Sequence, residues 1–412
     1  MSNTEGFDVE FVRGLFPSQC WDWAFFENAG GSYVPNSVID RLTAYMRETQ
    51  VQPGAHYPAS ALAQDRMDEG RRLMAAMIGA DMDEVSVSPS TSFNVYVLAN
   101  ALRPLWNDGD EIIVANQNHE ANAGPWHRLA ERGITVKEWK VDPQSGSLDP
   151  SDLDELLTDK TRLVAFPHVS NLVGEINDVP LITQKVHNAG AMVCVDAVAY
   201  APHRAIDVKA WDVDFYLFSF YKIFGVHMGC LYGKREHLLE AKGQYHFFIG
   251  EDETSYKLNP AGPQHEMFAS LVGIADYFDA VYSHHFGTPA NSLHERTKAC
   301  FELASQHEEK LSAQFLDFLT SKKSVRLIGT SSASRHDRAP TFAFSVAGRS
   351  SQEIPPLLEV DKVAVSAGNF YAYRLASALG YDPDDGVIRA SMVQYNTEAE
   401  VNMLIKALDR VL

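Results

Sequence analysis

Residues Val193–Gly229 read VCVDAVAYAPHRAIDVKAWDVDFYLFSFYKIFGVHMG, and this stretch decides the fold. It opens on an apolar run that ends at the carboxylate of Asp196, and a second apolar run, residues 214–221, ends at Lys222. Short apolar runs bounded by turns are typical of buried strands. Helical segments beside these strands predict an α/β sheet, which binds ligands beyond the carboxyl ends of its strands. An acid and an amine should therefore meet in one crevice.

A crevice that holds Asp196 and Lys222 suits pyridoxal 5′-phosphate. The lysine would form a Schiff base with the cofactor, and the aspartate would keep the pyridine nitrogen protonated, so that the ring can act as an electron sink. The two residues alone also allow a plainer interpretation. A strand-end aspartate often caps a helix, and a lysine after an apolar run is usually a solvated charge.

Composition narrows the class of protein. The chain has 412 residues, 45% hydrophobic and 22% charged, a globular composition for which two domains are expected. Its 35 basic and 54 acidic residues give a net charge of −19, which argues against nucleic acid or an anionic membrane as a partner. No signal peptide and no membrane span are recognisable, so we expect a cytoplasmic protein. No C-x-x-C spacing links the four cysteines, which are expected to pack in a reducing compartment: Cys20, Cys194, Cys230 and Cys300.

Strand-like and helix-like segments alternate through the first two thirds of the chain. Further strands are predicted at 85–88, 111–115, 135–141, 161–167 and 230–233, and helices at 35–49, 60–78, 149–157, 180–188 and 264–282. This β-α-β alternation predicts an α/β fold with a three-layer, mainly parallel sheet.

From about residue 287 the alternation stops. A long helix at 289–319 should be followed by strands at 325–328, 341–346, 362–366 and 387–393, and by a last helix that begins with a capping box at 397–400. We therefore expect an N-terminal arm (1–30) with a short strand at 23–26, a large domain (31–286) and a smaller C-terminal α+β domain (287–412).

Polar or small residues stand at several predicted strand or helix ends. Hydroxyl groups at 90–92 open a helix and suit an anion, although helix capping explains them equally well. His119 lies just past a strand end, where an imidazole can stack on a flat ring. Its spacing to Glu120 and His127 is not the H-E-x-x-H pattern of zinc proteases, so no metal site is expected.

The order of these features resembles the class V group of fold-type I pyridoxal-phosphate enzymes, near the cysteine desulfurases and isopenicillin N epimerase. The resemblance runs from Asn28 to the final helix, through FENAGGSYVP, NHEANAGPW, HVSNLVGEIND, VDAVAYAPH, SFYKIFG and IRASMVQYNTEAEV. Within this group the chain most resembles an uncharacterised desulfurase-like branch, because of the segments NHEAN, APH, YKIFG and AGNFYAYRL. The resemblance implies pyridoxal 5′-phosphate as the cofactor, an amino-acid substrate, and a homodimer with active sites shared across a two-fold interface.

The resemblance also implies a role for individual residues. Lys222 would be the Schiff-base lysine and would move the proton at the substrate Cα, Asp196 would pair with the pyridine nitrogen, and His119 would stack on the ring. Arg389 would bind the substrate carboxylate, and Asn171 would contact that carboxylate or the hydroxyl side of the ring. The phosphate would be held by Ser90, Thr91, Ser92, Ser219 and Tyr221, where Tyr221 replaces a frequent histidine. The substrate entrance would be lined by Ala29, Gly30 and, from a neighbouring subunit, His56.

Three positions depart from the family pattern. Tyr371 stands where desulfurases carry a nucleophilic cysteine, and no cysteine follows Cys300. Ala199 replaces a glutamine that touches the ring oxygen O3′. No phosphate-binding threonine is found near residues 260–264, where Gln264 or backbone N–H groups would take its place.

Without a thiolate on the loop, persulfide formation is not expected. Tyr371 would close the pocket, donate a proton to a leaving group, or only pack. The expected function is elimination of a β or γ substituent from an α-amino acid by a lyase. An epimerase, an aminotransferase and a γ-substituting cyclase share the first proton removal and remain open alternatives, as does a pyridoxal-phosphate- or ligand-binding protein without turnover.

Overall fold

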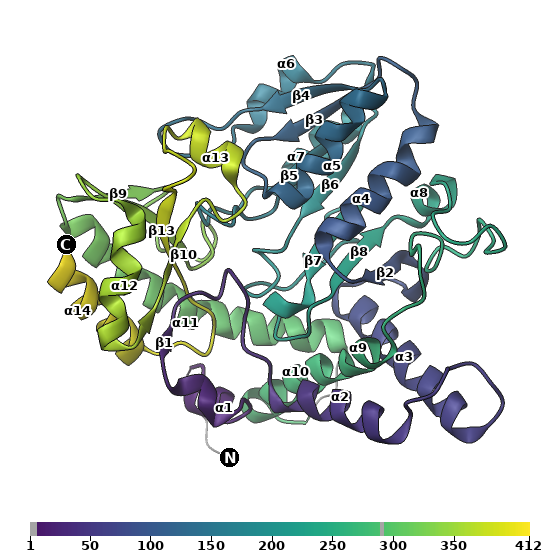
Figure 1. Cartoon of the computed structure of the whole chain (residues 1–412), viewed down its shortest axis with the longest axis horizontal. Coiled ribbons are helices and arrows are strands. Elements are labelled where there is room, and N and C mark those ends of the chain that lie inside the picture. The colour runs from purple at the N-terminus through teal and green to yellow at the C-terminus, as the bar shows by residue number, and fades with distance from the viewer. Residues whose placement is uncertain (1–5, 289–291) are drawn as a thin grey trace.

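A seven-stranded sheet forms the centre of the computed structural model, which describes residues 6–288 and 292–412 (Figure 1). Its strand order is β2-β8-β7-β6-β5-β3-β4. Neighbours pair in parallel except at β8, which runs antiparallel to both β2 and β7. The strands are β2 Val85–Ser88, β3 Glu111–Ala115, β4 Thr135–Trp139, β5 Thr161–Pro167, β6 Met192–Asp196, β7 Phe215–Ser219 and β8 Gly229–Gly233.

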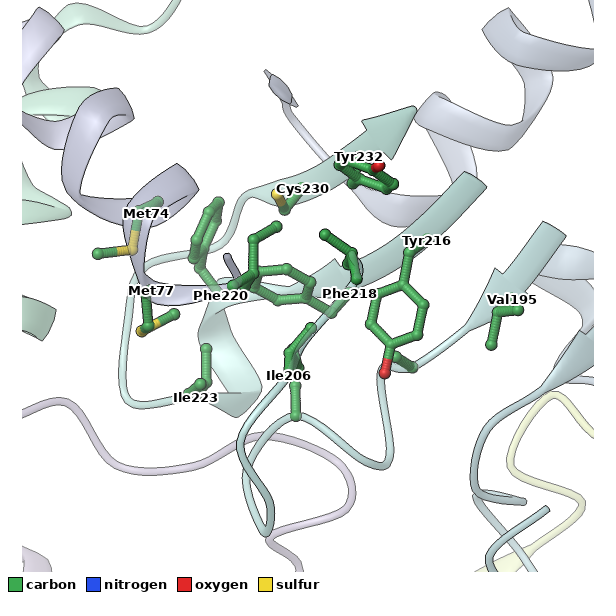
Figure 2. Close-up of a cluster of buried hydrophobic side chains, with 14 of the residues drawn as sticks. Met74, Met77, Val195, Ile206, Tyr216, Phe218, Phe220, Ile223, Cys230 and Tyr232 are labelled. Atoms are coloured by element: carbon green, nitrogen blue, oxygen red, sulfur yellow. The ribbon is translucent and has the colours of Figure 1, made fainter. Parts of the chain in front are cut away.

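Helices cover both faces of this sheet, which gives the three layers expected from the sequence. Alternate side chains of a strand point to opposite faces. Tyr216 and Phe218 of β7 pack with Met74 and Met77, while Phe215 belongs to a second apolar cluster on the other face (Figure 2). The first face carries α2 Asn36–Glu48, α3 Pro58–Met77, α7 Val179–Asn188, α9 His265–Ser270 and α10 Val272–Phe286. The second carries α4 Thr91–Leu102, α5 Gly124–His127 and α8 Arg235–Glu240.

A separate four-stranded antiparallel sheet, ordered β12-β13-β10-β9, occupies the C-terminal part of the chain (Figure 1). Its strands are β9 Val325–Ile328, β10 Thr341–Val346, β12 Ser366–Gly368 and β13 Val387–Ser391. The helices of this region are α11 Leu293–Ser321, α12 Ile354–Leu358, α13 Tyr373–Ala378 and α14 Glu398–Val411. The capping box expected for the last helix forms between Thr397 and Glu400.

The N-terminal arm is joined to this C-terminal sheet region. Its helix α1 (Val9–Arg13) precedes β1 (Ala24–Phe25), which pairs in parallel with β11 (Val363–Ala364). Ala24 and Phe26 share an apolar cluster with Phe342 and Phe344. The proposed domain boundaries at 30 and 286 stay a prediction. Within the described residues, no helix has the length and apolarity that crossing a membrane requires.

Several elements differ from the sequence-based expectation. The helix predicted at 149–157 is a 3-10 turn (Pro150–Asp152) followed by the four-residue α6, Leu153–Leu156. The strand predicted at 362–366 divides into β11 and β12, because its two halves pair with different partners, β1 and β13. The helix predicted at 264–282 is interrupted at Leu271 between α9 and α10. The long helix starts at Leu293, and its predicted start at 289 lies outside the described residues.

Candidate active site

A pocket lies at the carboxyl ends of the central strands. The strands β5, β6 and β7 end at Pro167, Asp196 and Ser219, and all three of these residues line it. The parallel arrangement therefore brings residues far apart in the chain to one edge, as the sequence predicted. The lining comprises Ser90, Thr91, Ser92, His119, Ala121, Pro167, Val169, Asn171, Asp196, Val198, Ala199, Ser219, Tyr221 and Lys222.

Lys222 is a buried amine in this pocket. It ends the 3-10 turn that follows β7, and its Nζ donates a hydrogen bond to the carbonyl of Ala29. Burial and the nearby Arg389 lower the pKa of Lys222 to about 7, although Asp196 acts in the opposite sense. An amine with this pKa is substantially uncharged at neutral pH, so it is able to act as a nucleophile or a base.

Asp196 is the carboxylate that the pocket buries at the end of β6. Its Oδ1 accepts a hydrogen bond of 2.9 Å from the Val198 N–H, which forms a local aspartate turn. Burial raises the pKa of Asp196 to about 6, partly offset by that hydrogen bond and by Lys222. A cationic ring nitrogen beside this carboxylate would favour its charged form.

His119 is an uncharged imidazole at the pocket wall. Its Nδ1 accepts a hydrogen bond of 3.0 Å from the Ala121 N–H, so the proton of the neutral ring lies on Nε2. Burial, together with Lys222 and Arg389, lowers the pKa of His119 to about 3. A neutral, fixed imidazole suits stacking on a flat cofactor.

Hydroxyl groups and a helix start form the anion-binding end of the pocket. Ser90 caps α4 by accepting a hydrogen bond from Phe93 N–H, and the first N–H groups of a helix have no partner within the helix. The Thr91 Oγ1 lies 2.7 Å from the Ser219 Oγ. Burial raises the pKa of Tyr221, which also lines this end.

Gly229 makes this arrangement possible, and the sequence analysis did not identify it. A Cβ at Gly229 would lie 2.5 Å from the Ser90 carbonyl carbon and from the Thr91 nitrogen. Only glycine therefore lets the start of α4 approach β8 so closely. A glycine directly before the strand predicted at 230–233 is the sequence signal that could have pointed to it.

Asn171 and Arg389 form the opposite side of the site. The buried Arg389 donates a hydrogen bond from Nη1 to the Asn171 carbonyl, at 3.1 Å, and its guanidinium lies 3.7 Å from the centroid of the Phe370 ring. Asn171 donates from Nδ2 to the Phe370 carbonyl, and its buried Oδ1 has no partner. Phe370 is thus a second site residue that the sequence did not point to.

The remaining predicted residues are placed as follows. Ala29 and Gly30 lie near Lys222 and Arg389, respectively, in a turn fixed by a 2.7 Å hydrogen bond from the Ala29 N–H to the Ser391 Oγ. Tyr371 is 73% exposed, with its ring centroid 5.4 Å from that of His119. Six predicted residues are absent from the pocket lining: Ala29, Tyr371 and Arg389 contact residues that line it, Gly30 lies beside Arg389, and the other two lie elsewhere. His56 is exposed on a loop, and Gln264 lines a neighbouring cavity beside Pro89.

The residues present fit pyridoxal 5′-phosphate. Asn171, whose buried Oδ1 has no partner, lines a pocket whose apolar walls, such as Val169 and Val198, can enclose a ring. A helix start and hydroxyl groups at one end suit a phosphate, and an amine and a carboxylate flank the space between. In the described ranges 6–288 and 292–412, no group of three or more His, Cys, Asp or Glu could hold a metal ion.

Comparison with known proteins agrees with this geometry. The family described as "Aminotransferase class-V" matches residues 24–404. The chain is 37% identical to the "Aminotransferase-like protein FGM3" of Gibberella zeae over 100% of both chains. It is 32% identical to the "Cysteine desulfurase-like protein ustD" of Aspergillus flavus, covering 98% of this chain and 90% of that protein. A solved cysteine desulfurase from Thermococcus onnurineus shares the fold, with a TM-score of 0.84 and 23% identity over 100% of this chain and 99% of the other.

Proposed function

Because the chain belongs to the aminotransferase class-V family and is a pyridoxal 5′-phosphate-dependent enzyme, we propose that it acts at the Cα of an α-amino acid. The reaction that we propose is elimination of a β or γ substituent by a lyase that forms no persulfide.

The positions of the cysteines support the proposal that no persulfide forms. No cysteine is found among the described residues that line the pocket. Cys194 and Cys230 lie in buried strands, and Cys230 packs in the apolar cluster of Figure 2. Burial raises the pKa of both thiols well above the usual range and that of Cys300 to about 12. A buried thiol that stays protonated is a poor nucleophile.

Tyr371 suits donation of a proton to the leaving group rather than capture of sulfur. It occupies the loop position where a desulfurase would place its nucleophile, and its exposed side chain stands beside His119. A phenol can donate a proton, but it forms no stable sulfur carrier. Elimination needs such a donor, whereas sulfur transfer needs a thiolate.

The residues of this chain divide the work of the reaction. The helix start at Ser90–Ser92 with Ser219 would hold the phosphate, and Asp196 would hold the proton on the ring nitrogen. The cofactor, when bound, supplies an electron sink for the charge left at Cα. Lys222 would take the Cα proton, since its lowered pKa leaves the amine free at neutral pH. Arg389 would orient the substrate through its carboxylate.

We also propose that the enzyme is a homodimer. His56 and Gln264 lie outside the pocket of their own chain, which is where residues that serve a partner's site would lie. The loop between α8 and α9 exposes Phe247 (99%) and Phe248 (69%). Adjacent aromatic side chains this exposed are typical of a surface that another protein covers.

The deciding experiment is an amino-acid panel assayed for ammonia, keto acid, sulfide and exchange of the Cα proton with deuterium from solvent. Steady release of ammonia and a keto acid supports the lyase. Exchange without ammonia would instead indicate an epimerase. Amino transfer to an added keto acid would indicate an aminotransferase, and a cyclic amine product would indicate a cyclase.

Persulfide formation is tested separately with L-cysteine, with and without dithiothreitol. Alanine as the product, with a persulfide on any of the four cysteines in the mass spectrum, would overturn the proposal. Pyruvate with free sulfide, or no reaction with cysteine, agrees with it.

A further inference from the structure

The loop that carries Tyr371 contains a turn of unusual backbone geometry. The Ala372 N–H donates to the Asn369 carbonyl at 2.8 Å, which closes a four-residue turn. Both central residues have positive φ, 50° at Phe370 and 59° at Tyr371. Two positive φ values characterise a type I′ turn, which strongly prefers asparagine and glycine. Two bulky aromatic residues in these positions are strained, and such strain persists only where the surrounding structure enforces it.

Four hydrogen bonds hold the turn in this conformation. The Phe370 carbonyl accepts from Asn171 Nδ2 at 2.9 Å, and the Tyr371 carbonyl accepts from the Glu120 N–H at 2.7 Å. The side-chain amide of Asn369 both accepts and donates a hydrogen bond. Its Oδ1 accepts from the Tyr371 N–H at 3.0 Å, and its Nδ2 donates to the Pro383 carbonyl at 2.9 Å. Two of these partners, Asn171 and Glu120, belong to the part of the chain that forms the pocket.

The turn brings Phe370 onto the buried guanidinium of Arg389. The ring centroid lies 3.7 Å from the Arg389 Cζ, and no carboxylate forms an ion pair with Arg389 in the part of the chain that the structure describes. Burial lowers the pKa of Arg389, and the Glu27 carboxylate offsets this only through its charge, without forming an ion pair. The aromatic face supplies further stabilisation, and it leaves the in-plane N–H groups other than the Nη1 donor to Asn171 available to a carboxylate.

We propose that Phe370 is a positioning residue for carboxylate recognition, which holds the Arg389 guanidinium by its ring and the Asn171 amide by its carbonyl. The inference rests on the proposed function, because it assumes an amino-acid substrate. The strained backbone serves both contacts at once: the ring faces Arg389 while the carbonyl accepts from Asn171. The same carbonyl thereby holds the side chain of Asn171, a residue that lines the pocket.

The test compares two ligands that differ only in the carboxylate. L-Norvaline and butylamine are titrated into the cofactor-loaded enzyme, and the dissociation constants are read from the absorbance of the cofactor. Neither ligand carries a leaving group, so elimination does not consume it. The variants are Phe370→Leu, which removes the aromatic face, and Phe370→Tyr, which keeps it. Tyr373→Leu is the matched control, because Tyr373 is an exposed aromatic residue three positions further on.

Phe370→Leu should weaken norvaline binding by roughly tenfold, the loss expected for a desolvated cation–π contact, and leave butylamine binding unchanged. Phe370→Tyr and Tyr373→Leu should bind both ligands as the wild type does. Melting curves like that of the wild type show that the variants are folded.

Equal weakening of both ligands by Phe370→Leu would show a merely structural role and overturn the inference. If the wild type binds norvaline well and Phe370→Leu binds it equally well, the inference is also overturned, but the proposed function is left intact. A wild type that binds neither ligand would overturn the proposed function itself, together with this inference.

Discussion

Lys222 shows how burial beside a second cation prepares a side chain for chemistry. Its pKa is lowered to about 7 from an ordinary value of 10.5, because the charged amine is desolvated and faces Arg389. The uncharged amine attacks the cofactor aldehyde, so capture of added cofactor by the apoenzyme should speed up as pH rises to about 7 and then level off. Stopped-flow absorbance between pH 5.5 and 10 measures this. A rate that keeps rising toward pH 10 would contradict the lowered pKa.

Lys222→Ala should abolish the covalent attachment of the cofactor that borohydride reduction makes permanent.

Arg389 is the residue on which substrate recognition is predicted to depend. Removal of one partner from a buried arginine–carboxylate pair typically costs about 2–5 kcal/mol. Arg389→Ala should therefore weaken amino-acid binding roughly thirtyfold or more, without changing the absorbance of the bound cofactor. Arg374→Ala is a matched control, since Arg374 is half-exposed and pairs with Glu120 at 3.4 Å. Equal binding of the amino acid and its decarboxylated amine by the wild type would refute the role of Arg389.

At the scale of elements, the contact between the start of α4 and β8 decides how the phosphate is held. A methyl group at Gly229 would meet backbone atoms of Ser90 and Thr91 at 2.5 Å, so the helix start must move. Gly229→Ala should lower the affinity of the apoenzyme for pyridoxal 5′-phosphate by about tenfold or more, comparable to the loss of one or two charge-assisted hydrogen bonds.

Pyridoxal without its phosphate serves as the comparison ligand for Gly229→Ala, and its affinity should barely change. Gly348→Ala is the control substitution, because a Cβ there meets nothing within 4 Å and the strain of its positive φ of 75° arises in the C-terminal region, away from the phosphate end. Fluorescence titration of the apoenzymes gives both affinities. A parallel loss for both ligands would mean that the substitution disturbs the whole pocket rather than its phosphate end.

At the scale of the whole molecule, a buried hydrogen-bond network ties the N-terminal arm to the C-terminal sheet. The Tyr395 hydroxyl donates to Asn28 Oδ1 and accepts from the Tyr33 N–H at 3.0 Å. Asn28 Nδ2 donates in turn to the Ser391 carbonyl at 2.9 Å. Tyr395→Phe leaves Asn28 Oδ1 and the Tyr33 N–H without these bonds and should destabilise the fold by about 1–3 kcal/mol. Urea unfolding measures the change, with Tyr381→Phe, whose hydroxyl is less buried, as the milder control.

The homodimer is also tested at this scale. We expect light scattering at micromolar concentration to give twice the chain mass of 45.8 kDa. Replacing both Phe247 and Phe248 by serine should shift the enzyme toward the monomer, whereas Leu239→Ser, on the neighbouring helix α8, should not. A monomer with full activity would refute the shared active site.

The sequence by itself determined much of the central sheet and of the pocket edge. The bounds of β2, β3 and β5 agree with the prediction. In β3 and β5 the reason is an apolar segment, as a strand buried on both faces requires, whereas the edge strand β2 alternates valine and serine. Asp196 and Lys222 could be placed after apolar runs in the same way, although the run predicted at 214–221 ends as a strand at Ser219 and continues to Lys222 as a 3-10 turn. Their proposed chemistry then depended only on the rule that parallel strands share one carboxyl edge.

Tertiary structure alone decided the features that depend on contacts between distant segments. The strand predicted at 362–366 divides because its first half pairs with β1 and its second half with β13. No local sequence pattern indicates these two pairings. Phe370, Arg389 and Asn171 meet because two separate sheets pack side by side, bringing together residues up to 218 positions apart. The lowered pKa of Lys222 likewise comes from burial, and burial is a property of the packed molecule rather than of the residue or its neighbours in the chain.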